Sequence, residues 1–159
     1  MSSSSPGQKL RILSVDDDTY YRRLLRIALT VDGHNVESVA DGFFAYELLA
    51  AAPRNYDVVI TDQCMPEMTG LEFLERLKRL PYHGKIYALS GTLTLELIEQ
   101  YRVLGADGVF DKTRQLSELR ETLHQLALVT GTTHSAQPFA RERPESSDGR
   151  LLASATSRD

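Results

Sequence analysis

The chain has 159 residues, of which 42% are hydrophobic and 25% charged, a balance typical of a globular protein long enough to bury a core. Its formal net charge of −4 excludes the basic footprint of a protein that binds nucleic acid or an anionic membrane. The single cysteine, Cys64, excludes an intramolecular disulfide and fits a reducing compartment. The start of the chain lacks the apolar segment of a signal peptide, and no stretch approaches the roughly 20 apolar residues that span a bilayer. We therefore expect a cytoplasmic protein.

Apolar periodicity predicts five strands that alternate with five helices. Before them, residues 1–8 are rich in serine and contain Pro6 and Gly7, and we expect a disordered leader there. In chain order, the expected strand and helix pairs are Lys9–Val15 with Thr19–Val31, Val36–Val39 with the segment between Gly42 and Pro53, Asp57–Thr61 with Gly70 through Leu77, Lys85–Leu89 with Leu93–Leu104, and Gly108–Phe110 with Gln115–Leu128.

The first of these helices has apolar side chains at helical spacing, and we expect them to form its buried face. They are Tyr20, Leu24, Ile27, Ala28 and Val31. Asp18 or Thr19 is the expected N-cap, because both side chains can accept a hydrogen bond from the first helical turn.

The alternation predicts an α/β fold, a doubly wound five-stranded parallel sheet in a (βα)5 arrangement. The run before Asp62 is continuously apolar, as expected of a strand covered by helices on both faces. We expect one folded domain over residues 9–128. Residues 129–159 are polar and rich in Ser and Thr, so we expect a disordered tail that is too short for a DNA-binding or catalytic output domain.

Acidic residues follow two of the expected strands, and a lysine follows a third. Asp16 and Asp17 close the first strand, Asp62 closes the third, and Lys112 follows the fifth. The carboxyl ends of parallel strands meet at one edge of a sheet, where sites form. Several carboxylates there repel one another unless a cation such as Mg²⁺ joins them, and Mg²⁺ prefers oxygen ligands. Ser90, at the end of the fourth strand, offers a hydroxyl to the same place.

This set of groups suits phosphoryl transfer, in which positioning and charge neutralisation do most of the catalysis. A carboxylate can be the nucleophile and form an aspartyl phosphate. Asp62 is the best candidate, because it stands alone on the middle strand between the acidic pair and Lys112.

At these residues the chain resembles the receiver domain of response regulators in two-component phosphorelays. The resemblance covers about residues 9–128 and rests on several separate motifs in the same order. They are ILSVDDD, GHNVESVADG, YDVVITDQCMPEMTGLEFLERLK, ALSG and GADGVFDK. It implies a flavodoxin-like sheet in the order 2-1-3-4-5.

The resemblance also implies a role for each site residue. Asp17 would bind Mg²⁺ directly, Asp16 would act mainly through a water, and Asp62 would be both phosphoacceptor and ligand. The backbone carbonyl of Cys64 would complete the coordination. The side chains of Ser90 and Lys112 would contact the phosphoryl oxygens.

Three positions depart from the family pattern. One is Gly91, which follows Ser90 where alanine is common. Thr113 stands where the family usually has a proline after the lysine, so the loop there is expected to be strained or differently shaped. Val109 stands where the family has a switch aromatic, so rotation of an aromatic side chain on this strand is not expected to carry the signal.

The favoured function is a stand-alone response regulator that takes a phosphoryl group from a sensor histidine kinase or a histidine phosphotransfer protein and changes its binding to an unidentified protein target. Two alternatives remain. One is an adaptor that uses the scaffold for docking without phosphorylation, which the departures at Thr113 and Val109 favour. The other is an aspartate-nucleophile phosphatase of the haloacid-dehalogenase type, whose motif Asp16 to Tyr20 matches except at Tyr20. For the favoured function we expect no turnover of an external substrate.

Overall fold

Strands and helices alternate along the computed structural model, which describes residues 7–131. The strands are β1 (Arg11–Val15), β2 (Asn35–Val39), β3 (Val58–Asp62), β4 (Lys85–Ser90) and β5 (Gly108–Asp111). The helices are α1 (Thr19–Val31), α2 (Gly42–Ala51), α3 (Gly70–Leu77), α4 (Leu95–Val103) and α5 (Leu116–Thr130), with a short 3-10 turn, η1 (Pro53–Asn55), after α2. The strands pair in parallel in the order β2-β1-β3-β4-β5. The predicted fold class and strand order are confirmed.

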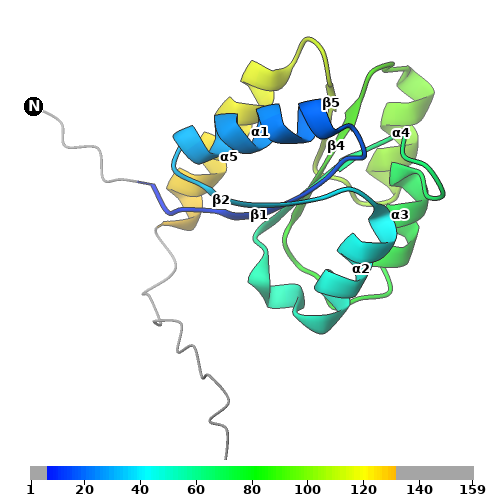
Figure 1. Ribbon diagram of the computed structural model, residues 1–159, viewed down its shortest axis with the longest axis horizontal. Helices are drawn as coiled ribbons and strands as arrows, with labels where there is room; N and C mark the ends of the chain where they lie inside the picture. Colours follow the sequence, from blue (N-terminus) through cyan, green and yellow to red (C-terminus); the bar gives the residue numbers. More distant parts are fainter. Residues whose placement is uncertain (1–6, 132–159) are drawn as a thin grey trace, which may run out of the picture.

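Helices cover both faces of this sheet (Figure 1). α1 and α5 lie on one face, and Leu25, Leu29, Leu119 and Leu123 pack there in a single buried cluster. α2, α3 and α4 lie on the other face, where a second cluster contains the buried side chains Leu49, Phe73, Leu74, Leu77 and Tyr101. Every residue of β3 is buried between the two layers. The central strand that ends at Asp62 is therefore held from both sides.

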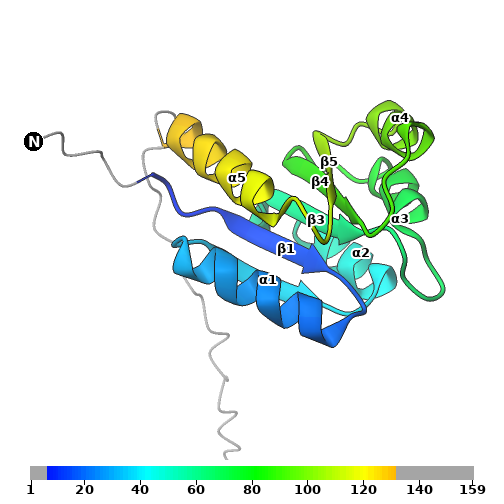
Figure 2. The ribbon, with the colours of Figure 1, turned by 90° about the horizontal axis from the view of Figure 1, so that it is seen from above.

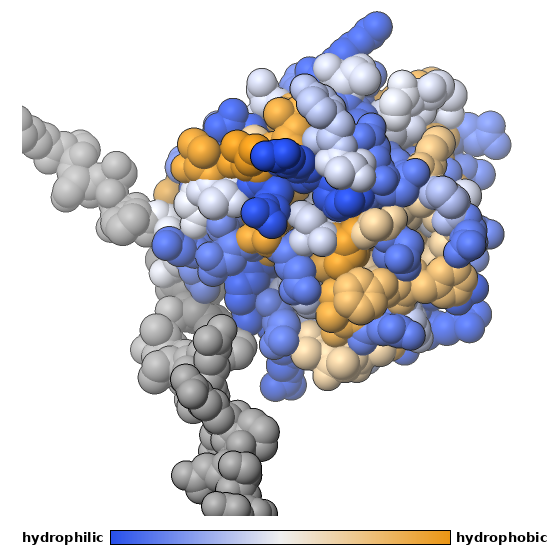
Figure 3. Space-filling view, viewed as in Figure 1, coloured by the Kyte–Doolittle hydropathy of each residue, from blue (hydrophilic) through white to orange (hydrophobic). Residues whose placement is uncertain are grey.

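The predicted buried face of α1 is wrong. Tyr20 is 78% exposed and Val31 is 76% exposed, and Leu24 and Ile27 also face solvent, whereas Leu25 and Leu29 are fully buried. The helix carries two apolar stripes, and its period alone cannot tell which of them meets the sheet. Figure 3 shows the resulting apolar surface over α1, and a second apolar area over α2, where Phe43 and Phe44 are exposed.

The start of the described segment lies against α5, the helix with which the segment ends. The backbone N–H of Gln8 donates to the carbonyl of Ala127 (3.1 Å). α5 continues to Thr130, two residues past the expected end of the domain. The rest of the expected leader and tail, residues 1–6 and 132–159, lies outside the described residues. Within residues 7–131, no helix is both long and apolar enough to cross a membrane.

Candidate functional site

Three carboxylates converge at the carboxyl edge of the sheet. β1 and β3 are neighbours, with Val15 opposite Thr61, so Asp16 and Asp62 emerge side by side. One carboxylate oxygen from each of Asp16, Asp17 and Asp62 lies within 4.8 Å of the others. Asp16 and Asp62 are buried, and Asp17 is exposed. The predicted acidic cluster therefore has one side open to solvent.

Local hydrogen bonds fix the turn from β1 into α1. Asp18 is the N-cap, and its Oδ1 accepts from the N–H groups of Tyr20 (2.9 Å) and Tyr21 (3.1 Å). Its own N–H donates to Asp16 Oδ1 (2.9 Å). The Arg22 guanidinium donates to the carbonyl of Asp16 (2.6 Å). These bonds orient the Asp16 side chain into the cluster before any ion binds.

Lys112 brings a positive charge to the same edge from the end of β5. Its backbone N–H donates to the carbonyl of Ser90 (2.9 Å), which ties this turn to β4. Its Nζ lies 2.7 Å from Asp16 Oδ2 and 3.4 Å from Asp62 Oδ2. Lys112 thus pairs with both carboxylates, and Asp16 is the closer partner.

The surroundings change the proton affinity of these groups. Burial, and then the charge of Asp16, raise the pKa of Asp62 to about 6, and Lys112 offsets only part of that rise. Burial also raises the pKa of Asp16, against the opposing effect of Lys112. For Lys112, burial lowers the pKa, but the ion pairs with Asp16 and Asp62 outweigh burial and raise it overall. One lysine is therefore not enough to neutralise the cluster.

The donor set fits a divalent cation. With three ionised carboxyl groups and one protonated lysine, two negative charges remain uncompensated in a partly buried site. Mg²⁺ is commonly held by one or two carboxylates together with waters and a phosphate, all through oxygen. Asp16, Asp17 and Asp62 supply oxygen atoms close enough to one another to share one such ion.

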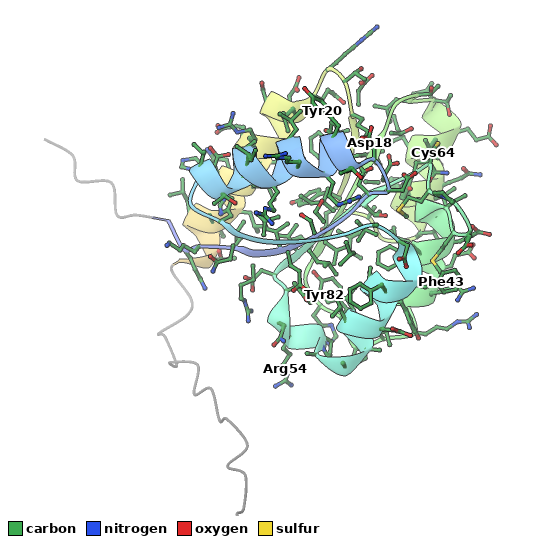
Figure 4. All side chains as sticks on the ribbon, in the orientation of Figure 1. Asp18, Tyr20, Phe43, Arg54, Cys64 and Tyr82 are labelled. Carbon is green, nitrogen blue, oxygen red and sulfur yellow. The ribbon has the colours of Figure 1, made fainter. Side chains whose placement is uncertain are left out.

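Ser90 and Cys64 flank this cluster. Ser90 is buried at the end of β4, where its hydroxyl donates to the carbonyl of Thr92 (2.8 Å) and accepts from the Thr92 N–H (3.2 Å). Cys64 is exposed in the loop that follows Asp62. Figure 4 shows it toward the same end of the sheet as Asp18. The roles expected of the Ser90 hydroxyl and the Cys64 carbonyl remain predictions.

The loop after Lys112 is shaped by Asp111. Its Oδ1 accepts from the Thr113 N–H (2.8 Å) and from the Thr113 hydroxyl (2.7 Å), and also from the Arg114 N–H (3.1 Å). A proline at position 113 could donate neither of the first two bonds. Thr113 therefore stabilises this turn through hydrogen bonds.

Sequence reasoning missed three residues beside the cluster. The Tyr21 ring centroid lies 4.6 Å from Lys112 Nζ. Gln63, next to Asp62, accepts a hydrogen bond from the hydroxyl of Tyr101 in α4. No motif marks these contacts, because each joins segments that are distant in sequence and meet only in the fold.

The fold and the acidic edge together define a receiver-type α/β domain. The chain belongs to the response regulator receiver domain family, whose model matches residues 12–124. It is thus a receiver domain of the kind found in two-component signalling systems.

Individual proteins that the chain resembles include response regulators of the same family. The chain is 34% identical over 122 residues to transcriptional regulatory protein TcrA of Mycobacterium tuberculosis, a match that covers 74% of this chain and 46% of TcrA. The structure of chemotaxis protein CheY4 of Vibrio cholerae is 31% identical, with a TM-score of 0.66 over 76% of this chain and 99% of that one. Response regulator TrrA of Thermotoga maritima, solved with Mg(2+)-BeF, is 29% identical, with a TM-score of 0.65 over 74% of this chain and 98% of that one.

The curated relatives are longer proteins. The chain covers 11% of one relative, a cyclic-nucleotide phosphodiesterase of Dictyostelium discoideum, and 57% of another, a response regulator of Mycobacterium leprae. The similarity therefore concerns the shared domain and not the activities of the rest of those proteins.

Proposed function

We propose that this chain is a phosphoacceptor switch. Asp62 takes a phosphoryl group from a phosphohistidine of a sensor histidine kinase or a histidine phosphotransfer protein, and the phosphorylated form binds a downstream protein with altered affinity. The observation that carries the proposal is the acidic cluster with Lys112 beside it, 2.7 Å from Asp16 and 3.4 Å from Asp62.

The chemistry follows from these positions. An Asp62 carboxylate oxygen attacks the phosphorus, the P–N bond to the donor imidazole breaks, and a P–O bond forms. Because the pKa of Asp62 is about 6, the nucleophile is mostly ionised at neutral pH. Asp16, Asp17 and Asp62 would hold Mg²⁺, which would supply positive charge to the phosphoryl oxygens. Lys112 can exchange its contact with Asp62 for one with the new phosphoryl group, and Ser90 can turn its hydroxyl from Thr92 toward the same group.

The switch follows from the added charge. A phosphoryl group brings about two negative charges to a site that is already acidic, so the neighbouring side chains must rearrange to neutralise it. Ser90 and Lys112 stand at the ends of β4 and β5, from which the chain runs on toward α4 and α5. We expect the face formed by α4, β5 and α5 to shift its population of conformations. A cytoplasmic location fits a partner of this type.

Acetyl phosphate provides a direct test. The whole chain is incubated with acetyl phosphate and Mg²⁺, and its intact mass is measured over time. We expect one added phosphoryl group on the wild type and none on Asp62→Asn. The matched control is Asp107→Asn, which alters an aspartate just before β5, at the opposite edge of the sheet, and should be labelled like the wild type.

Two results would favour the alternatives. If the wild type remains unmodified and does not bind Mg²⁺, the chain is better described as an adaptor that docks without phosphorylation. Steady release of p-nitrophenol from p-nitrophenyl phosphate would instead support the phosphatase, and we expect no such turnover.

A further inference from the structure

Tyr101 links α4 to the residue next to Asp62. Its hydroxyl donates a hydrogen bond to the side-chain carbonyl oxygen of Gln63. The Tyr101 side chain is fully buried. Burial, and then the charge of Asp62, raise the pKa of its phenol, so the group stays protonated and remains a donor.

The same hydroxyl occupies the space beside Gly70, the first residue of α3. A Cβ atom at position 70 would collide with the Tyr101 hydroxyl and would lie 2.6 Å from the carbonyl oxygen of Asp62. The Gly70 N–H donates to the carbonyl of Gln63 (3.0 Å). The two ends of the loop between β3 and α3 are thus held together around one phenol group. A glycine is needed at position 70 because no room remains for a side chain.

Tyr101 also dominates the attachment of α4. Among the nine residues of α4, all of them described, Tyr101 alone is buried. Leu97 packs against the same core only in part, and Leu95 is 87% exposed. α4 lies at an edge of the molecule (Figure 2). The position of this helix therefore depends strongly on one side chain, and the polar end of that side chain is bound to the loop after Asp62.

We propose that Tyr101 and Gln63 form a positioning pair that couples this loop to α4, so that a phosphoryl group on Asp62 displaces α4. The inference rests on the proposed phosphorylation of Asp62. An occupied site reorganises the loop, the Gln63 side chain moves with it, and the buried phenol must follow its acceptor or lose the hydrogen bond. A buried hydroxyl without a partner is unfavourable, so α4 moves with Gln63.

Beryllium fluoride with Mg²⁺ serves as the probe, because it mimics a bound phosphoryl group without turnover. Fluorine NMR detects occupancy of the site, and amide NMR spectra follow residues 95–103 of α4. In the wild type we expect a bound fluorine signal and shifted α4 amides. In Tyr101→Phe, we expect the bound signal to remain while the α4 shifts fall by about half or more.

Gln63→Leu tests the pair from the other side, with Tyr101 intact. Since both substitutions remove the same hydrogen bond, the double variant should respond like either single variant. Tyr82→Phe is the matched control, because its hydroxyl contacts the carbonyl of Lys85 at the start of β4 (3.4 Å), and it should behave like the wild type.

The outcomes separate the two proposals. A wild type that shows no bound fluorine signal contradicts the proposed function and with it the coupling. A wild type that binds the probe, with α4 shifts unchanged in Tyr101→Phe and in Gln63→Leu, keeps the function and overturns the coupling. Effects of the two substitutions that simply add would also count against a shared hydrogen bond.

Discussion

Lys112 is held by an aromatic ring as well as by carboxylates. The ring of Tyr21 lies 4.6 Å from the Lys112 ammonium, within the range of a cation–π interaction. Burial, and then the charges of Asp16 and Asp62, raise the pKa of Tyr21 to about 12, so the phenol stays neutral. Its hydroxyl is buried without a hydrogen-bond partner among the described residues. The ring therefore contributes to the site, and the hydroxyl adds little.

We expect Tyr21→Leu to slow labelling by acetyl phosphate on the order of fivefold, since the loss of a cation–π contact costs about 1 kcal/mol and leaves the ammonium less well placed. Tyr21→Phe keeps the ring and should label at the wild-type rate. The measurement is the rate of phosphoryl addition by intact mass. Equal slowing in both variants would show that the hydroxyl matters and the ring does not.

At the scale of single residues, a charged side chain directly after a predicted strand was a sufficient signal for most of the site. Asp16, Asp17, Asp62 and Lys112 could be predicted to meet, because each follows an apolar run and parallel strands end at one edge. Tyr101 could not be placed in the same way. Its contact with the Asp62 loop depends on how far α4 reaches across the sheet, and helical periodicity carries no information about that distance.

Among the elements, α1 shows why a helix with correctly predicted bounds can have a wrongly predicted buried face. Its bounds agree with the prediction, and Asp18 caps it as expected. The stripe that meets the sheet contains Leu25 and Leu29, whereas the predicted stripe is mostly exposed. The rotation of the helix is set by the turn that carries Asp16 to Asp18. Local hydrogen bonds fix that turn, and the Asp16 N–H ties it to β2 by donating to the carbonyl of Val39 (3.1 Å). Two apolar stripes of similar strength cannot be ranked without it.

Adjacent leucines in α1 allow a matched test of this rotation. Leu25→Ala should lower the free energy of unfolding by about 2–5 kcal/mol, as for other fully buried leucines. Leu24→Ala makes the same chemical change at a site that is 40% exposed, and it should cost about 1 kcal/mol or less. Urea unfolding of both variants measures the difference. A larger loss of stability for Leu24→Ala than for Leu25→Ala would contradict the orientation of α1 described above.

At the scale of the whole molecule, both buried clusters draw on nearly the full length of the described segment. Their buried members run from Leu10 to Ala127. Gln8 pairs with Ala127, so the start of the chain segment is tied to the last turns of α5. The domain bounds expected from composition, residues 9 and 128, stay a prediction.

We expect a shortened chain of residues 7–131 to have a free energy of unfolding within about 0.5 kcal/mol of that of the whole chain. The shortened chain keeps every buried side chain of both clusters. A chain that ends at Thr122 loses the buried residues Leu123 and Ala127 and should be strongly destabilised. Thermal unfolding of the three proteins makes the comparison. A large loss for residues 7–131 would mean that the remaining segments contribute to the fold.

The parallel order of the strands also bears on how the chain folds. Each neighbouring pair in this sheet is parallel and needs a crossover connection. The acidic cluster and Lys112 draw on the ends of β1, β3 and β5, which are far apart along the chain. Such non-local pairings form slowly, and they form only after much of the loop entropy has been lost. We therefore expect the repelling carboxylates to meet late in the folding reaction. A cation that recognises only the finished cluster lengthens the lifetime of the native state and leaves the folding rate nearly unchanged.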